Sequence, residues 1–547
     1  MLEKIKNLIF KIERKKISFE LIFLSIISIA FIRNIIENIL KSKNIYFGDD
    51  YITTIITYFF HFNFFWISIF LGLVIVLYLF TKKENNINSV LNISLFAFPI
   101  ILFPPLFDFA IGNTDLMLYP NNPADLIYDT VNFLSFNKKL YGITIGMRIE
   151  IFTICLLFGF YIFIKNKKIF RSVLGLLISY FIIAFHGLWL SFFAQIYEIG
   201  LNFTDNFSIA ESKLFSTGYV LRGSQSKISI IFISLTLIYL SIILYFKNKQ
   251  IFKTLISQLR TSRLLHYFFL IFIGILVGKR IVLIEFFDDT TFNNFLQFKN
   301  PFEIIGIFIS IVSMFLSFYS SVIFNDISDI HIDKISEPER PLPKNLISLK
   351  NYKKIGLFLL YISLSLAYCI NISFFLILIL INFVAYLYSN EPFRLKKYFL
   401  ISNFSLGFIA LFTFFLGTSV YLEQLFFKFI PFSISFILFI SITIISQIKD
   451  IKDYTGDKQN GIYNILTLTS FNSGKYIIGI QILLVAFFIP LYFEFYDLLI
   501  CSVLITAIIT FLFIRKKNSE NLLFSLYFIF LFWFFIRVIN SNILITN

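Results

Sequence analysis

Two sets of acidic side chains have a spacing that suits metal binding. The first set follows an apolar run and consists of Asp326, Asp329 and Asp333. The second set follows another apolar run and consists of Asp450, Asp453 and Asp457. Both sets have the spacing i, i+3, i+7, which places side chains on one face of an α-helix. The sequence therefore predicts two rows of carboxylates, each where a helix leaves an apolar environment.

Carboxylates that gather in this way repel one another unless a cation lies between them. Mg²⁺ accepts hard oxygen ligands and keeps places for water and for the phosphate oxygens of a substrate. A diphosphate suits such a site, because the metal and nearby cations neutralise the charge on its departing oxygens. Asn325 lies four residues before Asp329 and adds an amide oxygen. The alternative is that both sets are solvated helix ends at the edge of a membrane.

The rest of the chain predicts helices that cross a membrane. Of its 547 residues, 58% are hydrophobic and only 14% are charged, and the mean hydropathy is +0.83. Apolar stretches of about 20 residues recur throughout, which is the length that crosses the hydrocarbon. We expect an all-α polytopic membrane protein with about 15 transmembrane helices. Six are expected near 17–32, 55–80, 89–111, 142–164, 169–193 and 228–246. Nine more are expected near 265–283, 302–324, 354–371, 373–388, 398–421, 429–447, 476–492, 497–514 and 522–540.

Basic residues predict the orientation and the organisation of the chain. Lysine and arginine gather in loops after alternate spans, around 4–16, 82–83, 165–171, 247–253, 334–354, 394–397, 449–475 and 515–517. By the positive-inside rule, we expect the N-terminus and both acidic sets on the cytoplasmic side of the cell membrane. The same bias explains the net charge of +15, so we expect no nucleic-acid partner. The polar stretch 247–263 would connect an N-terminal region, 1–250, to a C-terminal domain, 258–547.

The acidic segments also resemble a known family. Asn325-Asp326-x-x-Asp329-x-x-x-Asp333 looks like the first aspartate motif of the UbiA superfamily of intramembrane prenyltransferases, and residues 449–461 resemble its second motif. Between them, YSNEPFRLK (388–396) is similar to the family's tyrosine-serine and arginine-leucine-lysine loop. The order of motifs and the expected nine-helix bundle extend this resemblance over roughly 258–547. The six-helix region before it has no counterpart of either motif.

The resemblance implies a lateral cavity open to lipid, with both aspartate motifs at its mouth. Mg²⁺ would bridge the aspartates to the diphosphate of a polyprenyl donor, whose ionisation gives an allylic cation that an acceptor captures. The implied metal ligands are Asn325, Asp326, Asp329, Asp333, Asp450, Asp453 and Asp457. The implied catalytic residues are Asp329, Asp333, Asp450 and Asp453. The implied substrate-binding residues are Arg340, Tyr388, Arg394, Lys396 and Lys458.

The acceptor is less well specified than the donor. Glu391 stands where the family usually has proline, and Lys344-Asn345 replaces a common serine-glycine pair. We expect transfer of a geranylgeranyl group to geranylgeranylglyceryl phosphate in ether-lipid synthesis. The alternative acceptor is an aromatic ring in quinone or chlorophyll-type biosynthesis. A different class of protein, a non-catalytic transporter or lipid-binding scaffold, is a further alternative.

The first half contains two weaker polar features. Asp115, Asp125 and Asp129 could bind a cation in an external loop, although their spacing is irregular and the loop is rich in turn residues. Arg148 and Glu150 lie near the start of an expected span, where they could pair with each other or mark its edge. Neither feature predicts a function for residues 1–250.

Overall fold

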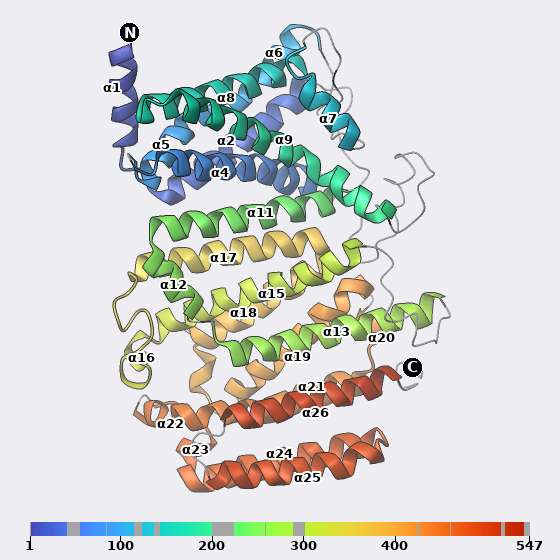
Figure 1. The fold of residues 1–547 in the computed structure, drawn as a ribbon. Coiled ribbons are helices and arrows are strands. Elements are labelled where there is room, and N and C mark those ends of the chain that lie inside the picture. The colour runs from blue at the N-terminus through green and yellow to red at the C-terminus, as the bar shows by residue number, and fades with distance from the viewer. Residues whose placement is uncertain are drawn as a thin grey trace. The chain divides into compact units, whose positions relative to one another are not determined.

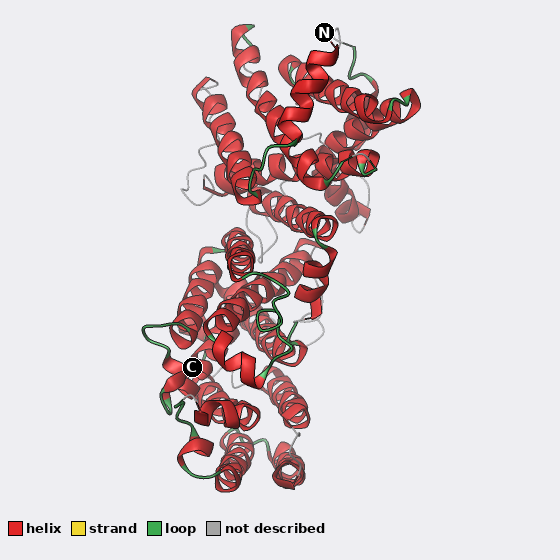
Figure 2. Ribbon diagram, turned by 90° about the vertical axis from the view of Figure 1, so that its left-hand side faces the viewer, coloured by secondary structure: helices red, strands yellow, loops and turns green. Residues whose placement is uncertain are grey.

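The protein is helical in the part of the chain that the structure, a computed structural model, describes (Figures 1 and 2). That part comprises residues 2–40, 55–83, 85–113, 123–135, 140, 143–199, 224–257, 259–287, 301–423, 426–459, 461–515 and 520–540. Within it, twelve helices are long and apolar enough to span a membrane. Three shorter apolar helices cover 432–448, 496–508 and 529–539. The expectation of an all-α polytopic membrane protein is confirmed.

Contacts divide the chain into two compact units. One comprises residues 1–253 with 299–302, and the other comprises 254–298 with 303–547. The first unit contains α1 (Leu2–Glu13), α2 (Phe19–Leu40), η1 (Ile56–His61), α4 (Phe62–Thr81), α5 (Ile87–Ala97), η2 (Phe98–Leu102), α6 (Phe103–Ala110), α7 (Pro123–Val131), α8 (Ile145–Asn166), α9 (Ile169–Ile199) and α11 (Ser224–Lys247). Helix α12 (Lys249–Ser257) crosses the boundary between the units.

In the first unit, α4 is apolar around most of its circumference and packs against α2, α8, α9 and α11. The amphipathic α1 is tied to α8 through Glu13, which accepts hydrogen bonds from Tyr161 at 2.5 Å and from Lys165 at 2.7 Å. The first span continues to Leu40, beyond the expected end at 32. It continues because buried Arg33 pairs with Glu37 at 2.5 Å and lies over the Trp66 ring.

The polar features expected in the first unit are separate from one another. Arg148 donates a hydrogen bond to the Ser135 carbonyl at 3.1 Å, whereas buried Glu150 interacts electrostatically with Arg33 on α2. The two therefore do not form the pair that was one of the alternatives. Asp129 is buried. Asp115 and the side chain of Asp125 lie outside the described part of the chain.

The second unit continues with α13 (Thr261–Phe287), α15 (Pro301–Ser328), α16 (Ile330–Ser336), α17 (Leu349–Ile370), α18 (Ile372–Ser389), η3 (Leu395–Lys397) and α19 (Ile401–Leu422). Its remaining helices are α20 (Phe426–Phe429), α21 (Phe432–Ile445), η5 (Ser446–Lys449), α22 (Asp450–Gln459), α23 (Ile465–Leu468), α24 (Phe471–Tyr492), α25 (Tyr496–Arg515) and α26 (Glu520–Asn540). Asn371 separates the closely spaced pair α17 and α18. Its side chain accepts a hydrogen bond from the Phe374 amide and so caps α18.

Helix α19 forms the centre of this unit and packs against α13, α18 and α21. Glycines allow α13 and α19 to approach closely. A Cβ atom on Gly274 would lie 2.2 Å from the Phe414 carbonyl oxygen, and one on Gly417 would lie 2.2 Å from that of Ile271. Small residues at such crossings are the usual means of packing helices in a membrane. This crossing fixes α13, whose first turn carries part of the candidate site.

Candidate functional site

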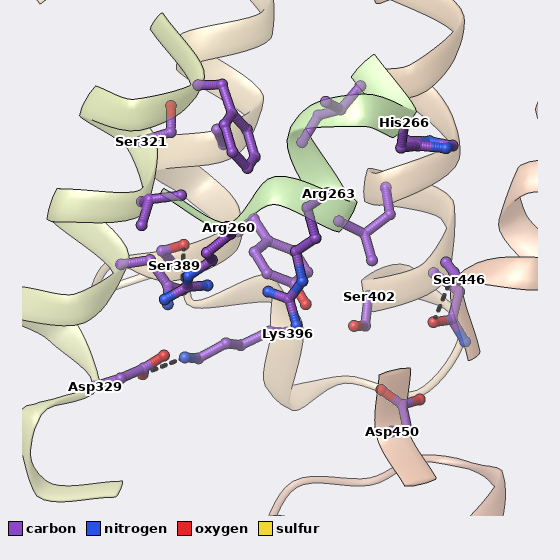
Figure 3. Close-up of a pocket in the computed structure, with 18 of the residues that line it drawn as sticks. Arg260, Arg263, His266, Ser321, Asp329, Ser389, Lys396, Ser402, Ser446 and Asp450 are labelled. Carbon is purple, nitrogen blue, oxygen red and sulfur yellow. Dashed lines mark hydrogen bonds and ion pairs between the residues drawn. The ribbon is translucent and has the colours of Figure 1, made fainter. Parts of the chain in front are cut away.

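A cavity of about 270 Å³ opens among α13, α15, α18, α19 and α21 in the second unit (Figure 3). The residues farther along the spanning helices make its wall apolar, among them Met314, Ile381, Ile409 and Ile442. Charged side chains line the end where α15, α18 and α21 finish. A long apolar wall with a charged mouth suits a molecule with a hydrocarbon tail and an anionic head.

The first acidic motif lies at the junction of α15 and α16. Helix α15 ends at Ser328 and α16 begins at Ile330, but the helical hydrogen bonds continue across the junction. The Asp329 amide donates to the Asn325 carbonyl at 2.9 Å, and the Asp333 amide donates to the Asp329 carbonyl at 2.8 Å. Asn325, Asp329 and Asp333 therefore line the cavity together.

Asp326 is not among the residues that line the cavity, which differs from the common face expected for the first set. Asp326 directly follows Asn325 in the helix, so its side chain is rotated by about 100° about the helix axis from that of Asn325. One of its oxygens accepts from Arg260 at 2.5 Å and from Arg340 at 3.2 Å. The other accepts from Tyr352 at 3.1 Å. Asp326 thus joins α15 to α17 and to the two arginines.

Cations are paired with the remaining carboxylates of the first motif. Asp329 accepts a hydrogen bond from Lys396 (Figure 3). It accepts a second hydrogen bond from Arg394 at 3.1 Å. Asp333 forms an ion pair with Arg340. Burial raises the pKa of Asp333 to about 6, although the Arg340 charge opposes that rise. Arg394 has a left-handed backbone (φ 41°) immediately before η3, which carries the buried Lys396.

The second acidic motif lies on α22, which packs against α16 and so brings the two motifs to the same end of the cavity. Asp450 and Asp457 line the cavity, and Asp457 accepts a hydrogen bond from Asn464 at 2.9 Å. The side chain of Asp453 lies outside the described part of the chain. Lys458 is exposed and does not line the cavity, whereas Tyr388 does.

Comparison with known proteins identifies this region. Residues 291–536 match the model of the UbiA prenyltransferase family. This part of the chain belongs to that family. Digeranylgeranylglyceryl phosphate synthase of Sulfurisphaera tokodaii is 28% identical over 199 residues, which is 36% of this chain and 70% of that protein. The protein of the same name in Saccharolobus solfataricus is 28% identical over 224 residues, 40% of this chain and 77% of that protein.

Solved structures of UbiA homologues align with about half of the chain. The homologue from Archaeoglobus fulgidus bound to DMAPP and Mg²⁺ is 17% identical, with a TM-score of 0.35, and covers 50% of this chain and 98% of its own. An apo homologue from Aeropyrum pernix is 16% identical, with a TM-score of 0.34, and covers 49% of this chain and 97% of its own.

The UbiA domain has the donor atoms that Mg²⁺ prefers, but they are not gathered around one point. Among the described side chains, no group of three or more His, Cys, Asp or Glu residues could hold a metal ion. In the first motif, Lys396 pairs with Asp329 and Arg340 pairs with Asp333, so these carboxylates already have cationic partners. The lining oxygens of Asn325, Asp329, Asp333, Asp450 and Asp457 are hard ligands that suit Mg²⁺. The site therefore fits the metal chemically, provided that the cations exchange partners.

Sequence reasoning missed the cations of α13. Arg260 and Arg263 were assigned to the connector, and the structure places both on the cavity wall with His266. It also missed Tyr352, which is fully buried. It placed Ser389 in a motif but gave it no role, and the structure shows that its hydroxyl donates to the Asn325 side chain at 2.9 Å. The available signal was two arginines three residues apart immediately before a span. That pattern was indistinguishable from ordinary positive-inside bias.

Proposed function

We propose that this chain transfers a geranylgeranyl group from its diphosphate to geranylgeranylglyceryl phosphate in ether-lipid synthesis. The observation that carries the proposal is the cavity, where residues of both acidic motifs lie at a charged mouth above an apolar wall. The relatives named digeranylgeranylglyceryl phosphate synthase support the choice of acceptor. Basic residues in alternate loops support a cytoplasmic mouth and N-terminus in the cell membrane.

In this proposal Asn325, Asp329, Asp333 and the aspartates of α22, including Asp453, hold Mg²⁺. When bound, the metal neutralises the diphosphate and makes it a better leaving group. Lys396 and Arg394 now pair with Asp329, and Arg340 pairs with Asp333. In the proposal all three cations leave these partners and bind the diphosphate. Tyr388 lines the same cavity and would donate a hydrogen bond from its hydroxyl group to the head group. Lys458 has no role in the proposal, because it lies outside the cavity lining.

The apolar wall serves the second half of the reaction. The C–O bond of the donor breaks with its electrons on the diphosphate, which leaves an allylic cation. The acceptor hydroxyl oxygen forms the new C–O bond, and its proton passes to an oxygen of the released diphosphate. Met314, Ile381, Ile409 and Ile442 keep water away from the cation until the acceptor reacts. The donor therefore lies with its head among the charged groups and its tail along this wall.

The test uses the purified full-length protein, Mg²⁺ and labelled geranylgeranyl diphosphate. One reaction contains geranylgeranylglyceryl phosphate, and a parallel reaction contains a hydroxybenzoate. We expect a labelled ether product in the first and little product in the second, with no turnover after chelation of the metal. Prenylation of the aromatic ring instead would contradict the acceptor. Absence of diphosphate release with either acceptor would favour a non-catalytic scaffold.

A further inference from the structure

Four lysine or arginine side chains line the cavity, and their partners differ. Arg260 pairs with Asp326, Arg340 pairs with Asp326 and Asp333, and Lys396 pairs with Asp329. Arg263 also lines the cavity but forms no ion pair or hydrogen bond with any residue in the described part of the chain. In that part of the chain, every lysine and arginine that lines the cavity, except Arg263, therefore pairs with an aspartate of the acidic motifs.

The position of Arg263 is fixed by the start of α13. The Leu264 amide donates to the Arg260 carbonyl at 2.9 Å, so Arg260 and Arg263 are neighbours three residues apart at the beginning of this helix. Figure 3 shows the Arg263 side chain extending from this turn into the cavity toward Lys396. Gly274 and Gly278 hold the same helix tightly against α19. A rigid helix therefore presents this guanidinium group to the charged mouth.

A half-buried arginine without a carboxylate partner is costly unless an anion binds to it. The donor diphosphate has its own ligands, because the proposed metal and the released cations Lys396, Arg394 and Arg340 gather around Asp329 and Asp333. A second anion in the same cavity would be repelled by that diphosphate unless a separate cation held it. Arg263 is the lining cation that pairs with no carboxylate in the described part of the chain.

We propose that Arg263 binds the phosphate monoester of the acceptor and so makes the enzyme selective for a phosphorylated acceptor. This inference rests on the proposed function, because it concerns the acceptor of that reaction. The planar guanidinium group can donate two parallel hydrogen bonds to phosphate oxygens, which fixes orientation as well as position. Arg263 lies outside the residues that match the family model, which begin at 291. Its role is therefore assigned from this cavity alone.

The test compares two acceptors that differ only in the phosphate, geranylgeranylglyceryl phosphate and geranylgeranylglycerol, with the full-length protein. In Arg263→Gln we expect the KM for the phosphorylated acceptor to rise about tenfold or more, since a charge-assisted hydrogen bond contributes at least that much. The KM for geranylgeranyl diphosphate should stay within about twofold. The variant should also lose the preference for the phosphorylated acceptor over the neutral one. Arg263→Lys keeps the charge and should recover part of that preference.

Lys344→Gln is the matched control. Lys344 belongs to the same loop region as Arg340 but pairs with Glu339 outside the cavity lining. We expect its acceptor KM to equal that of the wild type, which excludes a general effect of cytoplasmic charge. If Arg263→Gln does not accumulate as folded protein, the preference for the phosphorylated acceptor is compared between the wild type and Arg263→Lys instead. A weaker preference in Arg263→Lys is then the expected result.

Two results would overturn the inference while leaving the proposed function intact. One is a wild-type enzyme that forms product, together with an Arg263→Gln variant whose preference for phosphate is unchanged. The other is a rise in the KM for the donor alone, which would assign Arg263 to the diphosphate site. A wild-type enzyme that transfers nothing to geranylgeranylglyceryl phosphate would instead contradict the proposed function.

Discussion

Lys396 donates a hydrogen bond to Asp329 across 67 residues of sequence, and the two side chains come from η3 and from the junction of α15 and α16. Arg394 donates to the same carboxylate. The pairing neutralises the buried acid before any substrate arrives. It also holds two cations beside the place proposed for the diphosphate, so that the exchange of one partner for another would assemble the loaded site.

Asp329→Asn should reduce turnover by about 100-fold or more, because the change removes a proposed metal-ligand charge and the acceptor of both cations. We expect the variant to insert and to purify in folded form, with a lower midpoint of thermal unfolding because Lys396 and Arg394 lose their shared carboxylate. Diphosphate release measured over a range of Mg²⁺ concentrations is the check, with elution from a size-exclusion column as the control for folding. Asp453→Asn should behave in the same way. Wild-type turnover in either variant would remove that residue from the metal site.

Asp326→Asn should have a different effect, because Asp326 lies off the cavity lining and ties Arg260, Arg340 and Tyr352 together. Removal of one partner from a buried ion pair destabilises a protein by about 3 kcal/mol. We expect a lower midpoint of thermal unfolding in detergent and a lower kcat, with the Mg²⁺ concentration for half-maximal activity unchanged. A large increase in that Mg²⁺ concentration would show that Asp326 is a metal ligand after all.

The sequence predicted most of the helices and the two acidic motifs, because apolar length and carboxylate spacing are local properties. It did not show that Asp326 lies off the cavity lining, since that depends on Arg260 and Tyr352, which come from other helices. The end of the first span was wrong for a similar reason. Arg33 looks like the edge of a membrane until Glu37 and Trp66 supply its partners.

The cations of the site were predicted only where a motif named them. Lys396 and Arg340 belong to segments with a recognisable pattern, and the structure places both on the cavity wall. Arg263 belongs to no recognisable motif, and the residues around it resemble any basic segment that precedes a membrane span. Only the packing of α13 against α19 shows that this turn reaches the cavity.

Gly274→Ala should destabilise the second unit, because the added Cβ would lie 2.2 Å from the backbone oxygen of Phe414. Backbone cannot move aside as a side chain can. We therefore expect the free energy of unfolding to fall by about 1–3 kcal/mol. Thermal unfolding in detergent, followed by helical circular dichroism, measures it. Leu376→Ala, on an exposed part of α18, is the control and should change the midpoint little. Equal midpoints for the two variants would mean that α13 and α19 do not pack closely.

Truncation to residues 254–547 should yield a fragment that still inserts into the membrane and keeps the cavity. The boundary follows the division of contacts, and it retains the Leu255 carbonyl, which accepts a hydrogen bond from Tyr319 on α15. The residues that line the cavity all lie within this fragment, from Arg260 to Asn464. We therefore expect diphosphate release with a donor KM close to that of the full chain. The measurement is recovery of the fragment from purified membranes, followed by the labelled-donor assay, with the full-length protein prepared in parallel. If only the full-length protein can be recovered from the membrane, the two units fold together and residues 1–253 are part of the scaffold that builds the site.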